Sequence, residues 1–302
     1  MSAHDHRTPG TPLIGALAGT ALVGYLFPGL AGAWPALRRP LGIEDRTASG
    51  RGYALTFDDG PHTQGTPAVL EILSRTGTQA TFFLVGEQVL RNPALAREVL
   101  ATGHAIGLHC HRHRNLLRLG PRQVREDIER ARAAIEDATG ASPVLYRPPY
   151  GLLNAAALCL ASRRGWRTLL WSHWGRDWEA RATPESIAAR ATDGAGEGSV
   201  LLLHDADHYS ALGSWRRTAA ALPLLLEGLS ARGWRSRHTP STAMRSRAAA
   251  PTTALAAAPL GPRRRARPRA KAQGCLPASF QVAASRRPRA DRSGSPWTRH
   301  RC

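Results

Sequence analysis

Residues 53–61 read Tyr-Ala-Leu-Thr-Phe-Asp-Asp-Gly-Pro, an apolar run that ends abruptly in two carboxylates and a turn. The first five of these residues combine aromatic, aliphatic and β-branched side chains, which is typical of a buried strand. Gly60 and Pro61 favour a tight turn directly after it. Asp58 and Asp59 therefore lie at a strand end, where they repel each other unless a cation or a proton lies between them. A surface turn without function is the alternative for this motif alone.

The central part of the chain repeats this strand pattern and alternates it with helical segments. Short apolar runs predict further strands at residues 80–85, 105–108, 144–146, 168–171 and 200–203. Amphipathic segments predict helices at residues 92–101, 121–139, 153–164, 184–191 and 214–232. Strands that alternate with helices indicate an α/β sheet or barrel of parallel strands. In such folds the active site gathers at the carboxyl ends of the strands.

Three histidines follow the strand predicted at residues 105–108, namely His109, His111 and His113. On one helical turn His109 and His113 would face the same way, which suits two imidazoles that bind one cation. In an extended chain all three would share a face, so other ligand pairs stay open. A solvated histidine cluster is the structural alternative. Cys110 is a further zinc-ligand candidate, but we expect a small packed residue there.

A carboxylate from one strand end and two imidazoles from another form an open ligand set, with positions left for water and substrate. Zn²⁺ suits such a set, and Co²⁺, Mn²⁺ and Fe²⁺ accept similar ligands. The sequence therefore indicates a divalent-metal site that joins the two strand ends.

Two more predicted strands end in polar residues. Arg147 follows residues 144–146 and can hold a carboxylate in a bidentate ion pair. The turn that continues through Pro148 and Pro149 can aim a backbone N–H at a developing oxyanion. His204 follows residues 200–203 and is a candidate general acid. A surface ion pair for Arg147 and a hydrogen-bonded core histidine for His204 are the structural alternatives.

The formal net charge of +19 suggests at first an anionic partner such as nucleic acid. Residues 239–302, however, carry fourteen Arg and Lys side chains against one acid, which leaves +6 on residues 1–238. This tail is rich in Ala, Arg and Pro and lacks apolar periodicity, so we expect disorder. No binding motif accompanies its arginines, which favours an extension without a role over a basic arm for anionic polymers. We expect no specific nucleic-acid partner.

Residues 12–37 contain no charged side chain, a run long enough to span a bilayer. Five glycines and Pro28 interrupt it, which leaves a buried or interfacial hairpin as the alternative. The stretch Ala31-Gly32-Ala33 fits a signal-peptidase site, whereas the arginines at positions 38 and 39 favour a cytoplasmic location for the domain after them. We give the length and the cleavage pattern more weight. They predict membrane association or export to the bacterial cell envelope.

In this order, the motifs resemble carbohydrate esterase family four, the polysaccharide deacetylases related to chitooligosaccharide deacetylases. The resemblance covers residues 51–238 and rests on residues 56–60, 109–113, 147–150 and 202–204. It implies a distorted (β/α) barrel of parallel strands with outer helices. It also implies three parts: a hydrophobic N-terminal segment and linker at 1–50, a catalytic domain at 51–238, and the basic tail at 239–302.

The resemblance implies roles for four residues in proton transfer. Asp58 would be the catalytic base, and Arg147 would orient it. His204 would be the catalytic acid, and Asp177 would tune its pKa.

The resemblance also implies a set of binding residues. The metal ligands would be Asp59, His109 and His113, with Zn²⁺ the expected ion and Co²⁺ or Mn²⁺ as alternatives. The substrate would contact the backbone N–H of Tyr150, Trp178 and Leu202. Two positions depart from the family pattern: Trp174 stands where an acid is usual, and Cys110 where a hydroxyl residue is usual.

The implied activity is metal-dependent hydrolysis of N-acetyl groups on a polysaccharide or oligosaccharide that contains N-acetylglucosamine, such as chitin or peptidoglycan. The partner would be the acetylated glycan itself. Two alternatives stay open. One is an O-acetyl esterase that acts on acetylated xylan or a similar glycan, and the other is an inactive, membrane-tethered glycan-binding protein.

Overall fold

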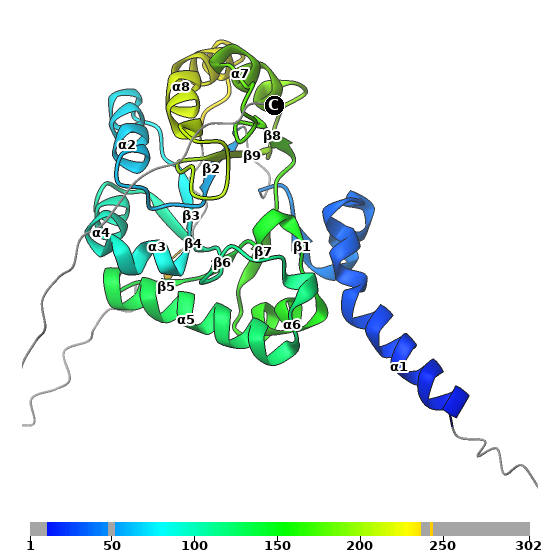
Figure 1. Ribbon diagram of the computed structural model, residues 1–302. Coiled ribbons are helices and arrows are strands. Elements are labelled where there is room, and N and C mark those ends of the chain that lie inside the picture. The colour runs from blue at the N-terminus through cyan, green and yellow to red at the C-terminus, as the bar shows by residue number, and fades with distance from the viewer. Residues whose placement is uncertain (1–10, 48–51, 237–241, 244–302) are drawn as a thin grey trace, which may run out of the picture. The chain divides into compact units, whose positions relative to one another are not determined.

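Eight parallel strands form the centre of the protein. The computed structural model describes residues 11–47, 52–236 and 242–243 (Figure 1). Neighbours in the sheet hydrogen-bond in the order β1 (Ile43–Glu44), β7 (Arg167–Leu169), β6 (Leu145–Tyr146), β4 (Ala105–Leu108), β3 (Thr81–Leu84), β2 (Ala54–Asp58), β9 (Val200–His204) and β8 (His173–Trp174). Every pair in this order is parallel.

The sheet curls until its two ends approach each other. Strands β7 and β8 lie near opposite ends of the strand order, yet only residues 170–172 separate them in the chain. A connection of this length spans at most about 14 Å, so a flat sheet of eight strands could not accommodate it. An isolated antiparallel bridge between Arg46 and Ser199 links the two ends further. The expected distorted barrel of parallel strands is confirmed.

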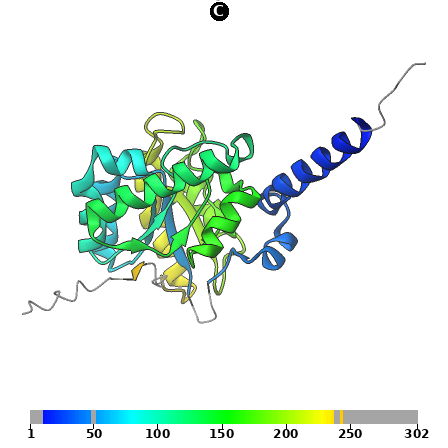
Figure 2. The same ribbon diagram turned by 90° about the horizontal axis from the view of Figure 1, so that it is seen from below.

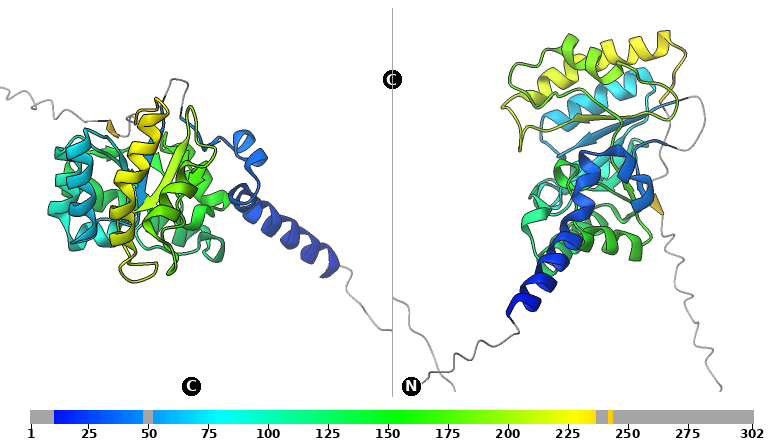
Figure 3. Two further views of the ribbon diagram at one scale, coloured as in Figure 1. Left: turned by 90° about the horizontal axis from the view of Figure 1, so that it is seen from above. Right: turned by 90° about the vertical axis from the view of Figure 1, so that its right-hand side faces the viewer.

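Helices pack around the outside of the curled sheet, as Figures 2 and 3 show. They are α2 (Gly65–Thr76), α3 (Gly86–Arg91), α4 (Pro93–Ala101), α5 (Pro121–Thr139), α6 (Ala155–Arg163), α7 (Pro184–Thr192) and α8 (Ser214–Ala231). Contacts between helices run in the order α6, α5, α4, α2, α8 and α7, which follows the order of the strands beneath them. These helices therefore cover the outer face of the sheet, and β1 at its edge contacts the 3₁₀ turn Arg39–Leu41.

The predicted elements match the structure closely, but several further elements were not predicted. All six predicted strands occur within one or two residues of the expected bounds, and α5 has the predicted bounds. Pro121 occupies its first turn, and Gly140 ends it at φ 71°, a backbone conformation that glycine adopts readily. The helices α2 and α3 and the two-residue strands β1, β8, β5 (Ser142–Pro143) and β10 (Thr242–Ala243) were not predicted.

The N-terminal apolar run forms α1 (Thr11–Leu26) and three short 3₁₀ turns (Phe27–Gly32, Pro35–Leu37 and Arg39–Leu41). Within the described ranges, no helix by itself has the length and apolar composition to cross a membrane. The helical segments Gly19–Gly32 and Pro35–Leu41, which meet at an angle of 117°, have the required length and apolar composition only when they are taken together. The expected membrane association stays a prediction.

The segment that leads into β1 is bonded to the barrel. Arg38 is buried and donates hydrogen bonds to the carbonyls of Ala31 and Trp171, at 2.9 and 3.1 Å. Its Nη1 also pairs with Asp45 at 2.8 Å. Tyr25 donates from its hydroxyl to the carbonyl of Leu119 at 2.7 Å. Part of the predicted N-terminal segment 1–50 thus packs against the predicted catalytic domain.

The predicted disordered tail lies outside the described residues, apart from Thr242 and Ala243. These two residues form β10, which pairs antiparallel with β5. The division of the chain into 1–50, 51–238 and 239–302 stays a prediction.

Candidate active site

The register of the parallel strands brings the predicted motifs to one level of the barrel. Asp58, the last residue of β2, pairs with His204, the last residue of β9. Leu108 of β4 pairs with Tyr146 of β6, so the residues that follow them, His109 and Arg147, also lie side by side. Carboxyl ends of neighbouring parallel strands meet at one edge. Residues that are up to 146 positions apart in the chain therefore share one site.

Asp59, His109 and His113 form the cluster predicted to bind metal. Their candidate ligand atoms all lie within 4.8 Å of one another. The Oδ1 atom of Asp59 is 3.6 Å from Nε2 of His109 and 3.4 Å from Nε2 of His113. Asp59 and His109 are buried, and the side chain of His113 is 7% exposed. One carboxylate and two imidazoles thus converge on a single point.

The protonation pattern of this cluster fits a divalent cation. Nδ1 of His109 lies 2.8 Å from the carbonyl of Arg147, which can only accept, so Nδ1 carries the proton and Nε2 keeps its lone pair. Burial lowers the pKa of His109 and of His113 to about 3, so both rings are neutral, as metal ligands must be. Oδ1 of Asp59 is buried and has no hydrogen-bond partner among the described residues.

Several buried carboxylates add to the need for positive charge. Burial raises the pKa of Asp59 to about 7; the charge of His204 opposes this rise, and those of Asp58 and Asp205 add to it. A cation among these groups would favour their ionised forms and reduce their mutual repulsion. The residues present therefore fit the metal that the resemblance implies.

The loop between the two histidines is not a helical turn. Residues 109–113 form an irregular segment after β4, and Cys110 has φ 62°, in the left-handed region. His109 and His113 meet through this bend rather than through helical i,i+4 geometry. His111, the alternative ligand, lies outside the cluster. Cys110 is buried as expected, with Sγ 3.8 Å from the hydroxyl of Tyr146.

Arg147 holds Asp58 in place. Its Nη1 donates to Oδ1 of Asp58 at 2.7 Å and to the hydroxyl of Thr56 at 2.8 Å. Nε and Nη2 donate to the carbonyls of Leu169 and Leu170, at 2.8 and 3.1 Å. The guanidinium is fully buried, and these bonds leave it one orientation. Burial raises the pKa of Asp58, and the charge and hydrogen bond of Arg147 oppose that rise.

His204 pairs with Asp177. Nδ1 of His204 lies 2.9 Å from Oδ1 of Asp177, and the His204 backbone N–H donates to Oδ2 at 2.7 Å. The hydroxyl of Thr218 also donates to Oδ2 at 2.7 Å, which fixes the carboxylate from a third direction. Burial lowers the pKa of His204, but the charge and hydrogen bond of Asp177 outweigh burial, and the pKa rises to about 10. The ring is therefore a protonated donor at neutral pH.

A cavity of about 260 Å³ opens over these groups. Besides the acids and histidines, its lining is mainly aromatic and apolar: Tyr150, Trp171, Trp174, Trp178, Leu202 and Tyr209. Trp178 meets the ring of His204 edge-on, with centroids 5.5 Å apart. Trp174 and Tyr150 are exposed, by 43% and 55%. The cavity thus has a polar floor with aromatic walls that remain open to a large ligand.

Tyr209 was not singled out from the sequence. It follows β9 in a loop, and its ring stacks on His113 with centroids 4.5 Å apart and planes 13° apart. Its hydroxyl donates to Glu87 at 2.7 Å and accepts from Gln88 at 3.1 Å. The sequence feature that could have identified Tyr209 is its position five residues after His204, just beyond the end of a predicted strand. Asp127 of α5, which accepts the backbone N–H groups of His111 and Arg112, was also not singled out from the sequence.

A second group of potential ligands, His62, Asp207 and His208, has its atoms within 4.8 Å of one another. Nδ1 of His62 accepts the backbone N–H groups of Gln64 and Gly65, at 3.2 and 2.8 Å, where α2 begins. Nε2 therefore carries the proton in the neutral ring, and it lies 3.3 Å from Asp207. Both ring nitrogens are occupied within the protein, which favours a helix-capping role.

The fold and the site define a parallel-stranded barrel with a candidate metal site of one carboxylate and two imidazoles. The family model for polysaccharide deacetylases matches residues 45–169. A peptidoglycan-N-acetylglucosamine deacetylase of Bacillus cereus is 37% identical over 184 residues, which cover 60% of this chain and 83% of that protein. The chitooligosaccharide deacetylase of Azorhizobium caulinodans is 37% identical over 187 residues, 60% of this chain and 89% of that protein. The chain belongs to the polysaccharide deacetylase family, carbohydrate esterase family four.

The structural comparison agrees with this family. The crystal structure of the Bc1960 peptidoglycan N-acetylglucosamine deacetylase matches with a TM-score of 0.62 at 27% identity, over 67% of this chain and 92% of that chain. Some relatives are much longer. The chain spans 36% of the length of the peptidoglycan-N-acetylglucosamine deacetylase of Listeria monocytogenes, to which it is 36% identical over 184 residues.

Proposed function

We propose that the protein is a metal-dependent hydrolase that removes N-acetyl groups from a glycan containing N-acetylglucosamine. The convergence of Asp59, His109 and His113 beside the Asp58–Arg147 and His204–Asp177 pairs supports this proposal most directly. The arrangement offers metal ligands, a carboxylate base and a protonated imidazole within one cavity. Zn²⁺ is the expected ion, with Co²⁺ or Mn²⁺ as alternatives.

Asp58 acts as the base in this proposal. An amide resists water because its carbonyl is a poor electrophile and its nitrogen a poor leaving group. A divalent cation held by Asp59 and the two histidines would lower the pKa of a water molecule and polarise the acetyl carbonyl. Asp58, fixed by Arg147, accepts the proton of the attacking water through its second oxygen.

His204 and Tyr150 complete the reaction. The backbone N–H of Tyr150 donates to the developing oxyanion, from a turn in which Tyr150 has φ 59° and Gly151 N–H bonds the carbonyl of Pro148 at 3.1 Å. His204, protonated through its pair with Asp177, donates a proton to the departing nitrogen. Leu202 and Trp178 enclose the acetyl methyl group on the apolar side of the cavity.

The shape of the cavity favours a glycan over a small amide. Trp174 and Tyr150 extend its wall to the surface, where their exposed faces suit the apolar faces of sugar rings. In this family an acid is usual at the position of Trp174, so we propose that the replacement alters substrate preference. Names of the relatives point to the same chemical class, peptidoglycan or chitooligosaccharide.

A substrate panel tests this function. The full-length chain would be incubated with a divalent metal and with N-acetylglucosamine oligomers, peptidoglycan or acetylated xylan, while acetate and free amine are measured. N-deacetylation predicts equal amounts of acetate and amine from an N-acetylated glycan. Release of acetate from acetylated xylan alone would contradict the proposal and indicate an O-acetyl esterase. Glycan binding without release of acetate would identify a binding protein.

We further propose that the N-terminal segment attaches the protein to a membrane. Four of its apolar side chains are between 43% and 68% exposed: Leu22, Val23, Phe27 and Leu30. Trp34, 63% exposed, is a residue type that favours the membrane interface. The full-length chain should sediment with phospholipid vesicles, and a chain that begins at Trp34 should not. Equal sedimentation of both would refute the attachment.

A further inference from the structure

One buried acid lies behind the metal-binding loop and outside the catalytic cavity. Asp127 is on α5, on the same helix face as the buried residues Val124, Ile128 and Ala131, and only 4% of it is exposed. A carboxylate on an apolar face is costly unless donors satisfy it. Asp127 must therefore have partners that compensate for its burial. They are His111 and Arg112, which lie between the two histidines, and Arg114, which follows His113.

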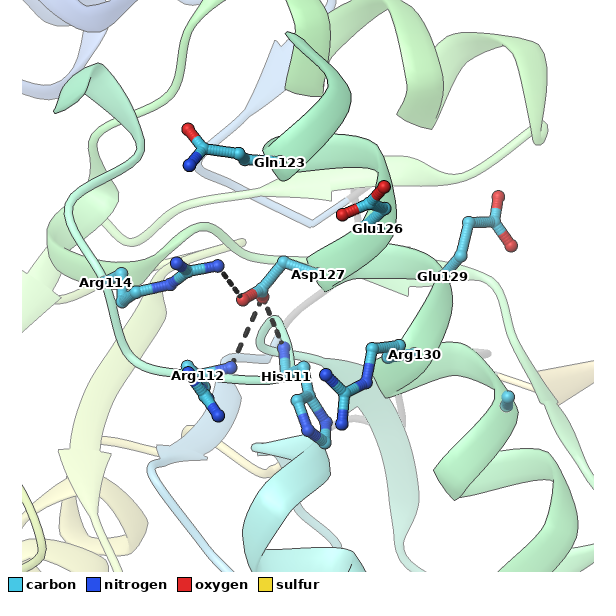
Figure 4. Close-up of a pocket in the computed structure, with 9 residues that line it drawn as sticks. His111, Arg112, Arg114, Gln123, Glu126, Asp127, Glu129 and Arg130 are labelled. Carbon is cyan, nitrogen blue, oxygen red and sulfur yellow. Dashed lines mark hydrogen bonds and ion pairs between the residues drawn. The ribbon is translucent and has the colours of Figure 1, made fainter. Parts of the chain in front are cut away.

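Asp127 accepts three hydrogen bonds from residues 111, 112 and 114, as Figure 4 shows. Its Oδ2 accepts the backbone N–H groups of His111 and Arg112, at 2.7 and 3.3 Å. Its Oδ1 pairs with Nη2 of Arg114 at 2.6 Å. The two amides lie between His109 and His113, so Asp127 restrains the backbone that links the two imidazoles.

The opposite side of the same backbone is restrained by α3. The N–H groups of Gly86 and Glu87 donate to the carbonyls of Cys110 and His111, at 2.9 and 3.0 Å. The loop is thus held by its carbonyls on one side and by its amides on the other. This double restraint accounts for the left-handed conformation of Cys110, at φ 62°, which a non-glycine residue rarely adopts unaided.

The two histidines depend on this restraint to different degrees. His109 follows β4 directly, and its ring is fixed by the carbonyl of Arg147. His113 lies beyond the bend, and its Nδ1 has no hydrogen-bond partner among the described residues. Its ring lies between those of Tyr150 and Tyr209, with centroid distances of 4.4 and 4.5 Å. The backbone position of His113 is therefore set largely by the loop.

We propose that Asp127 is a positioning residue that presets the separation of His109 and His113 before a cation binds. This inference rests on the proposed metal-dependent function, but Asp127 itself is absent from both the ligand cluster and the lining of the catalytic cavity. It acts through the backbone of residues 111 and 112. Groups that orient metal ligands in this way typically change metal affinity by about 10–100-fold when they are removed.

The test uses Asp127→Asn in the full-length chain, with Glu126→Gln as the matched control. Glu126 is the neighbouring acid on α5, and it pairs with Arg122 on the surface. An asparagine keeps the shape but turns an NH₂ group toward a donor, so at least one of the three hydrogen bonds must break. We expect Co²⁺ to bind Asp127→Asn about 10–100-fold more weakly than the wild type and to give an altered visible absorption spectrum. The control should match the wild type.

Acetate release supplies a second readout. With Co²⁺ in excess, Asp127→Asn should recover most of its kcat with an unchanged KM, because the residue touches neither substrate nor reacting atoms. Equal Co²⁺ affinity and an equal spectrum in Asp127→Asn and the wild type would overturn the proposal, even if thermal stability fell. If Asp127→Asn does not fold, Arg114→Gln removes one of the three bonds and must weaken Co²⁺ binding. A wild type that binds Co²⁺ but releases no acetate would refute the proposed function and leave the Asp127 comparison valid.

Discussion

At the scale of single residues, the pair His204–Asp177 controls the expected pH response. Asp177 raises the pKa of His204 to about 10 against the opposing effect of burial, so the acid stays protonated well above neutral pH. In Asp177→Asn the negative charge is lost and the pKa of His204 falls. The alkaline limb of the kcat/KM profile should therefore move to lower pH, while the acidic limb stays in place. A shift of the acidic limb alone would mean that acid and base have been exchanged.

Asp58 and His204 should affect rate without affecting metal content. Neither belongs to the ligand cluster, and in the proposed reaction each transfers one proton. We expect Asp58→Asn and His204→Ala to lower kcat by factors on the order of 10²–10⁴. Metal stoichiometry, measured by elemental analysis, should remain that of the wild type. Undiminished activity in His204→Ala would indicate an ester substrate, whose leaving group needs less protonation.

Some site residues could be predicted from the sequence and others could not, for a physical reason. Asp58, His109, Arg147 and His204 each end or follow a predicted strand, and parallel strands bring their ends together. Asp127 and Tyr209 reach the site through contacts between elements whose relative positions no local pattern encodes. The residues that could be predicted are therefore those at the ends of strands. The residues that were missed contact them from neighbouring elements.

At the scale of elements, prediction succeeded where apolar periodicity was long enough to detect. The 19 residues of α5 repeat their apolar face several times, whereas two-residue strands such as β1 and β8 contain no period at all. The start of α2 at Gly65, Thr66 and Pro67 lacks the residues that favour helices. The bend at Cys110 depends on α3 and α5, so the sequence alone left its conformation open.

The segment before residue 50 should contribute to stability. A chain that begins at residue 48 loses β1 and the buried hydrogen bonds of Arg38, whereas one that begins at Trp34 retains β1 and the Arg38–Asp45 pair. Loss of β1 and of the Arg38 hydrogen bonds should lower the free energy of unfolding by about 3 kcal/mol in the chain that begins at residue 48. Its Tm should therefore be roughly 6–12 °C below that of the chain that begins at Trp34. Thermal unfolding of both chains measures this difference. Equal Tm values would show that this segment adds nothing to the barrel.

At the scale of the whole molecule, the basic tail should be dispensable for catalysis. Every predicted site residue lies between Asp58 and His204, well before the basic tail begins at residue 239. A chain that ends at Ala248 also keeps β10 and should retain the specific activity of the full-length protein. Acetate release from a soluble oligosaccharide checks this expectation. A large loss would contradict it, and a loss seen only on anionic or particulate polymer would assign the tail a docking role.

The central claim is that Asp59, His109 and His113 hold a metal ion required for deacetylation, and it is tested most directly by titration of chelated protein. Zn²⁺ or Co²⁺ would be added back to the metal-free chain while acetate release from an N-acetylglucosamine oligomer is measured. Activity should be absent at first and rise in proportion to bound metal up to one ion per chain. His109→Ala and His113→Ala should bind no metal and stay inactive. Full activity of the chelated chain, or unchanged metal content in both variants, would contradict the account.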